Sequence, residues 1–165
     1  GLMSVGNSNF TLAIYDNDTV GMAKMNETKK LQLPKNMRVM KLPDLKDFRR
    51  FTTLGTNGER KENINAKAVA IECFLDLKWQ EVDEPKVRWA VFDEKSGKYQ
   101  GALNRKHEYA KRFLKLGTKE SAYSFDKLEY LLDAIIGECN AIAGDSRRHA
   151  WNQVACNYAT TQSSS

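Results

Sequence analysis

Residues 68–103 decide the predicted fold, and they read AVAIECFLDLKWQEVDEPKVRWAVFDEKSGKYQGAL. From Val69 to Trp79 an apolar side chain occupies every second position. Alternation of this length is typical of a β-strand that buries one face in a core. Acidic residues and a proline then interrupt the pattern between Gln80 and Pro85. We therefore predict a strand over 68–79.

Two further strands follow at short intervals. Alternate positions from Val87 to Val91 are apolar, and so are alternate positions from Tyr99 to Leu103, with Gly101 between them. The loop from Asp93 to Gly97 provides a glycine for a positive-φ turn position. Because short connections force neighbouring strands to run antiparallel, residues 68–103 are predicted to form a three-stranded antiparallel meander.

The period of the apolar residues changes after this stretch. Asn104 precedes an amphipathic segment over about 105–116, and Ser124 precedes a longer one over about 125–143 whose apolar residues step by three and four. Gly144 is expected to end the second helix. Upstream, the patterns predict a strand at 10–15, short strands at 31–33 and 37–40, a short helix at 44–51 and a loop at 55–58. Strands first and helices last predict an α+β fold, with both C-terminal helices packed on an antiparallel sheet.

Length and composition suit one ordinary domain. The chain has 165 residues, of which 41% are hydrophobic, and it contains no apolar run long enough to cross a bilayer. We expect a flexible N-terminus over 1–9, a single domain over 10–159 and a polar tail over 160–165. Three scattered cysteines and the lack of a basic-then-apolar leader favour an intracellular protein, cytoplasmic or nuclear.

Motifs for catalysis, cofactors or metals are not found in the sequence. It contains no glycine-rich phosphate loop and no nucleophile elbow, and its two histidines are too few for an HExxH zinc site. Glu72 and Asp76 share a face of the predicted strand and could form a metal or acid–base pair, but a half-buried strand also needs polar residues on its outer face. We expect Cys73 and Cys139 to be small buried apolar residues. No catalytic residue, cofactor or metal ligand is therefore assigned.

Charge is distributed unevenly along the chain. The net charge of +5 combines basic blocks over 24–50 (+6) and 86–119 (+7) with acidic blocks over 51–85 (−3) and 120–145 (−5). Lysine and arginine side chains neutralise phosphates, and exposed aromatic rings stack on unpaired bases. No helix-turn-helix, zinc finger or RNP signature is present to read a duplex sequence.

These blocks predict a non-enzymatic nucleic-acid-binding domain that takes RNA or another single-stranded nucleic acid. Trp89 and Tyr99 are at alternating apolar positions and are interpreted as core residues. The phosphate contacts are predicted at Arg88, Lys98, Arg105, Lys111, Arg112, Lys115, Arg49 and Arg50.

Two other functions remain open at this point. The chain could be a self-associating structural, coat-like or interaction protein, a homo-oligomer in which the basic and acidic helices pair between copies. It could also be an enzyme whose site is assembled from dispersed residues, because the absence of a motif is weak evidence against catalysis.

Overall fold

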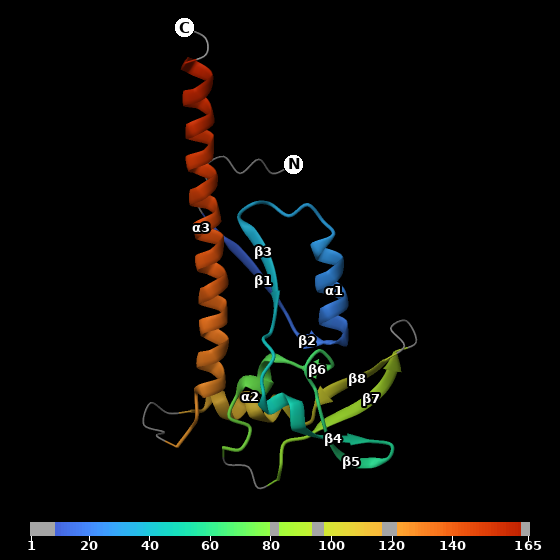
Figure 1. The fold of residues 1–165 in the computed structure, drawn as a ribbon. Coiled ribbons are helices and arrows are strands. Elements are labelled where there is room, and N and C mark those ends of the chain that lie inside the picture. The colour runs from blue at the N-terminus through green and yellow to red at the C-terminus, as the bar shows by residue number, and fades with distance from the viewer. Residues whose placement is uncertain (1–8, 80–82, 94–97, 117–121, 163–165) are drawn as a thin grey trace.

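A computed structural model of the chain describes residues 9–79, 83–93, 98–116 and 122–162 (Figure 1). It is a mixed α+β structure. In chain order the elements are β1 (Thr11–Tyr15), β2 (Asn17–Asp18), α1 (Thr19–Lys29), β3 (Met37–Lys41), the 3-10 helix η1 (Asp47–Arg50), β4 (Phe51–Gly55), β5 (Gly58–Glu62), β6 (Ala68–Val69), the 3-10 helix η2 (Ile71–Phe74), β7 (Val87–Asp93), β8 (Lys98–Leu103), α2 (Lys106–Leu114) and α3 (Asp126–Gln162).

The first part of the chain is a β–α–β unit. β1 pairs with β3 in parallel, and α1 forms the crossover between them. The carboxylate of Asp18 caps α1 by accepting a hydrogen bond from the Gly21 amide at 2.6 Å. A Cβ at Gly21 would lie 2.2 Å from the carbonyl oxygen of Asp16, so only glycine fits this turn. The expected separation of strands from helices is therefore wrong, and residues 31–33 form no strand.

A four-stranded mixed sheet of order β5-β4-β7-β8 forms the lower part of the molecule (Figure 1). β4 and β5 form a hairpin around the predicted loop 55–58, where Gly58 has φ 85°. β7 runs parallel to β4 and antiparallel to β8. The second hairpin of the predicted meander is thus present, but the sheet is completed by residues 51–62 and not by 68–79.

The predicted strand over 68–79 is wrong. Only Ala68 and Val69 are extended in a ladder, and they pair with β2, after which the chain turns into η2. Cys73, Phe74 and Leu75 are consecutive and all buried. Ile71, in contrast, is exposed, so burial does not follow the alternation of apolar residues and the alternation does not indicate a half-buried strand.

The core lies between the sheet, η1, η2 and the helices. The rings of Phe48 and Phe74 meet edge to face with centroids 5.5 Å apart, and Val87 is fully buried beside them. Tyr109 of α2 and Leu131 of α3 close the same cluster. Burial of such side chains stabilises the fold by about 1.5–3 kcal/mol each.

The C-terminal helices differ in extent from the expectation. α2 is shorter than predicted, whereas α3 continues past Gly144 and into the expected polar tail as far as Gln162. A glycine inside a helix costs only about 1 kcal/mol, so it does not stop a helix whose neighbours favour it. Within the described residues, no helix combines the length and apolar character that a bilayer crossing requires.

Candidate functional site

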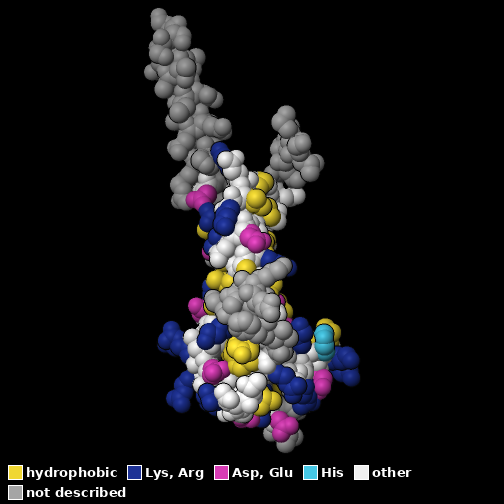
Figure 2. Space-filling model, turned by 90° about the vertical axis from the view of Figure 1, so that its right-hand side faces the viewer, with side chains coloured by type: hydrophobic (Ala, Val, Ile, Leu, Met, Phe, Trp, Pro, Cys, Tyr) yellow, Lys and Arg dark blue, Asp and Glu magenta, His cyan; other side chains and the backbone are white. Residues whose placement is uncertain are grey.

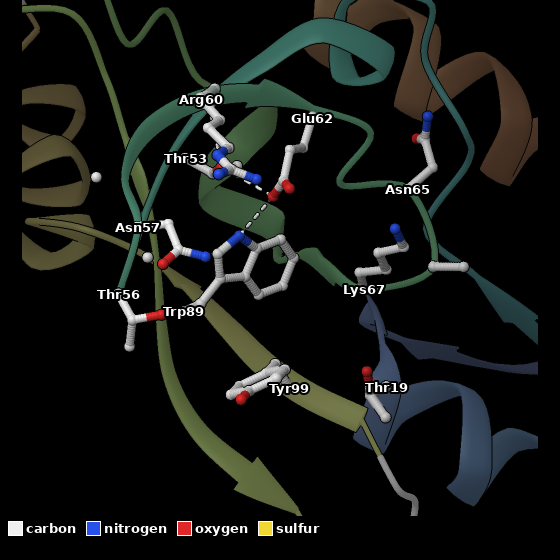
Figure 3. Close-up of a pocket in the computed structure, with 13 residues that line it drawn as sticks. Thr19, Thr53, Thr56, Asn57, Arg60, Glu62, Asn65, Lys67, Trp89 and Tyr99 are labelled. Carbon is white, nitrogen blue, oxygen red and sulfur yellow. Dashed lines mark hydrogen bonds between the residues drawn. The ribbon is translucent and has the colours of Figure 1, made fainter.

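A pocket of about 610 Å³ opens beside the four-stranded sheet. Its walls come from the β4–β5 turn, from β7 and β8, from the loop before β6 and from the first residue of α1. Figure 3 shows these side chains around the indole of Trp89. The volume falls within the ~300–1,000 Å³ of small-molecule and cofactor sites.

Hydrogen bonds fix the position of the Trp89 ring. The indole Nε1 donates to Glu62 Oε2 at 2.7 Å, and Thr53 Oγ1 donates to the same oxygen at 2.9 Å (Figure 3). Thr53 is buried and lies on β4, whereas Glu62 ends β5. Because the carboxylate joins residues of β4, β5 and β7, the ring is held by three neighbouring strands.

Glycine residues make room for this ring. Gly101 lies opposite Trp89 in the β7–β8 register, and a Cβ on it would lie 2.5 Å from Trp89 Cζ3. A Cβ on Gly55 would be 3.5 Å from Trp89 Cδ1, which is ordinary contact. Gly101 is therefore needed for the indole to lie along the sheet.

Tyr99 supplies a second aromatic ring to the pocket. Tyr99 is 58% exposed, so its interpretation as a core residue is wrong. Trp89 is half-buried and packs partly against the core. Thr56 and Asn57, in the β4–β5 turn, add hydroxyl and amide groups at the other end of the pocket (Figure 3).

The pocket carries two cations and one carboxylate. Arg60 on β5 and Lys67 before β6 line it together with Glu62. Among the residues that the structure describes, no carboxylate forms an ion pair with Arg60 or Lys67. Two cations against one carboxylate give the described lining of the pocket a net positive charge.

The predicted contacts on α2 lie outside this pocket. Arg105 donates from Nε to Glu108 at 2.8 Å, and Arg112 lies 4.0 Å from the same carboxylate and over the Tyr109 ring. The hydrogen bond from Arg105 lowers the pKa of Glu108, which keeps this carboxylate ionised. Lys111 and Lys115 are exposed on the same helix.

The other predicted contacts are dispersed. Arg49 and Arg50 are exposed at the end of η1. Arg88 is exposed on β7, and because side chains alternate along a strand it points away from the face that carries Trp89. Lys98 opens β8, and its side chain lies outside the described part of the structure.

Several cations of the two basic blocks already have acidic partners. Arg38 pairs with Glu138 and Asp145 of α3, and Lys86 pairs with Glu59 at 2.5 Å. Lys and Arg side chains point outward on several sides of the lower body, with Asp and Glu between them (Figure 2). The net charge of a sequence block is therefore a poor measure of the free positive surface.

Asp76 and Asp16 are carboxylates outside the pocket. Asp76 accepts from the Lys78 and Ser124 amides at 3.1 Å each, so it does not form the suggested strand pair with Glu72. The pKa of Asp16 is raised, first by partial desolvation of its carboxylate and then by the negative charges of Asp18 and Glu72. Within the described residues, no group of three or more His, Cys, Asp or Glu side chains is placed to hold a metal ion.

The two cysteines whose side chains the structure describes lie in different environments. Cys73 is buried, and desolvation raises its pKa to about 12, which excludes a reactive thiolate at neutral pH. Cys139 is exposed on α3, so its expected burial is wrong.

Thr53, Arg60, Glu62 and Lys67 are not among the residues predicted from the sequence. One signal was available: the turn Gly55-Thr-Asn-Gly58 followed by four charged residues is typical of a hairpin with a solvent-facing strand. Comparisons with protein-family models, with curated proteins and with solved structures gave no match to this chain. The function is therefore inferred from the geometry of the site.

Proposed function

We propose that this chain binds single-stranded nucleic acid, RNA or DNA, and that the pocket beside β7 and β8 receives an unpaired base. The observation that carries the proposal is the pair of aromatic residues, Trp89 and Tyr99, beside the cations Arg60 and Lys67, which have no acidic partner among the described residues. Aromatic rings and cations side by side are the features that single-strand binding sites share.

Rigidity of the indole supports base stacking. The ring is hydrogen-bonded to Glu62, which Thr53 holds in turn, so the ring loses little conformational freedom when a base stacks on it. Every base has a π-face, so stacking is tolerant of sequence and contributes about 1–3 kcal/mol per base. The proposal therefore predicts weak sequence preference.

Phosphate contacts are assigned first to Arg60 and Lys67. The predicted cations outside the pocket then extend the electrostatic surface along the strand, and these are Arg88, Lys98, Arg105, Lys111, Arg112, Lys115, Arg49 and Arg50. Arg105 and Arg112 contribute less to binding, because a phosphate must compete with the Glu108 carboxylate that already pairs with them.

A fluorescently labelled single-stranded oligonucleotide tests the proposal by anisotropy. At ~50 mM salt the wild-type chain should bind, and affinity should fall linearly on a log–log salt plot. Arg60→Glu with Lys67→Glu should weaken binding by about tenfold or more and flatten the salt slope. Lys111→Glu with Lys115→Glu is the matched control, because it removes the same charge from α2 and should have a smaller effect.

The aromatic contribution is tested separately. Tyr99→Ala should weaken binding by roughly fivefold or more, the lower end of one stacked base. Tyr99→Phe keeps the ring and should bind like the wild type. No binding at ~50 mM salt overturns the proposal. A larger loss in the α2 control than in the pocket variant would also overturn the assignment to the pocket.

A further inference from the structure

α3 is a helix of 37 residues, about 55 Å long, and the body of the protein covers only one side of it. Leu131 and Ile142 are buried, and Leu128 and Ile135 pack partly against the core. Figure 1 shows the helix along one edge of the molecule, with its C-terminal half extending beyond β1, β3 and α1. Between residues 126 and 145, where the side chains are described, α3 therefore has a buried side and a side with large exposed hydrophobic residues.

A second apolar stripe lies beside the buried one. Leu132 and Ile136 are each 55% exposed, Cys139 is exposed, and Ala143 follows at the same spacing. We call these four residues the α3 stripe. Their intervals of four, three and four residues are those of a coiled-coil seam. The sequence continues the spacing with small residues at 146 and 150, Ser and Ala, which permit close approach of a second helix.

From this stripe we infer that α3 pairs with α3 of a second copy of the chain, in antiparallel orientation. An identical helix offers the same stripe, and a two-fold axis near Cys139 and Ala143 would join the two stripes in one closed interface. The partner surface is thus already specified by this chain.

Charge along α3 determines the orientation. Glu138 and Asp145 are engaged by Arg38 of the same chain. In the first half of the helix this leaves Asp126, Glu129 and Asp133 against a single lysine, and the sequence of the second half carries Arg147 and Arg148. A parallel pair would place acidic segment against acidic segment, whereas an antiparallel pair brings each acidic segment opposite a basic one.

The inference goes beyond nucleic-acid binding, because the pocket residues do not lie on α3. It also differs from the expected pairing of the basic and acidic helices, since α2 takes no part. Sedimentation or light scattering over a concentration series, without nucleic acid, should show a dimer.

The stripe is tested by Leu132→Lys with Ile136→Lys, which should raise the dimer dissociation constant roughly tenfold or more, the scale of central interface residues. Tyr130→Lys is the matched control, because Tyr130 is 51% exposed on the opposite side of the same helix and should leave the dimer unchanged. Circular dichroism confirms that each variant keeps its helix content.

Charge reversal tests the orientation. Asp133 and Arg147 are two heptads apart, so both flank the α3 stripe on the same side. In an antiparallel pair, Asp133→Lys places a lysine close to Arg147 of the second copy and should weaken the dimer. Adding Arg147→Glu to the same chain should restore it. In a parallel pair the first change replaces repulsion between carboxylates with repulsion between lysines, so the dimer should keep its stability. An unchanged dimer therefore overturns the antiparallel arrangement.

Three results would overturn the inference as a whole. They are a monomer at all concentrations up to ~100 µM, an equal loss of the dimer with Tyr130→Lys, and an assembly larger than a dimer. A monomer that binds lipid vesicles through the α3 stripe would assign the stripe to a membrane surface and would likewise overturn it.

Discussion

Gly101 is the position where one added methyl group should disturb both stability and the pocket. In Gly101→Ala the new Cβ would lie 2.5 Å from Trp89 Cζ3 and 2.7 Å from the Cβ of Ala68. Ordinary carbon contacts are ~3.5–4.0 Å, so the ring would have to move by about 1 Å. Ala68 is buried and pairs with β2, so its contact is relieved only by a shift of the backbone, whereas the contact with Trp89 is relieved when the ring moves.

This movement has a calculable cost. Displacement by about 1 Å would stretch the bond from Trp89 Nε1 to Glu62 Oε2 from 2.7 Å beyond hydrogen-bonding distance. Loss of a hydrogen bond to a carboxylate costs about 1.5–3 kcal/mol, and overpacking costs about 1–3 kcal/mol. The two costs do not add fully, because the ring movement that breaks the hydrogen bond also relieves the overpacking. We therefore expect Gly101→Ala to lower the free energy of unfolding by about 2–4 kcal/mol.

Urea unfolding followed by circular dichroism measures this change. Trp89→Leu removes the ring, so adding Gly101→Ala in that background should cost less than in the wild type. Gly137→Ala is the matched control, because its Cβ would meet nothing within 4 Å on α3 and should stabilise the protein by about 0.5–1 kcal/mol. If Gly101→Ala stays within about 0.5 kcal/mol of the wild type, the ring is not confined as described.

Two further predictions follow from the pKa shifts. Partial desolvation, Asp18 and Glu72 raise the pKa of Asp16 in the folded state, so its ionisation disfavours folding. Asp16→Asn should therefore raise the melting temperature at pH 7, with the gain shrinking as pH falls through the raised pKa and vanishing below the ordinary one. An equal gain at low pH would contradict this. Burial raises the pKa of Cys73 to about 12, so mass spectrometry after thiol labelling at pH 8 should find Cys73 modified only in denaturant. Labelling in the native protein would refute its burial.

Local patterns predicted the elements whose partners are near in sequence. The β7–β8 hairpin and the β4–β5 turn join residues separated by a few positions, so apolar alternation predicts the first and the glycines at 55 and 58 predict the second. The turn position predicted for Gly97 lies outside the described residues. The amphipathic spacing after Ser124 predicted the first part of α3 for the same reason.

Other elements had no local signal. The segment of α1, TVGMAKMNETK, lacks an apolar stripe, and the helix forms because Asp18 caps it and because it links β1 to β3. In 71–75 the apolar alternation is present, but the chain turns as the 3-10 helix η2, with Ile71 exposed and Cys73, Phe74 and Leu75 buried, and it belongs to none of the sheets of the described residues.

The sequence by itself determined the α+β character, one hairpin, the amphipathic helices and the uneven charge, because each depends on residues close together in the chain. The tertiary structure alone decided which cations have acidic partners, as with Arg38 and α3. It also decided the pocket, whose walls come from residues between Thr19 and Tyr99. Hydrogen bonds and van der Waals contacts act over a few ångströms of space, so a site built from distant segments exists only once the chain has folded.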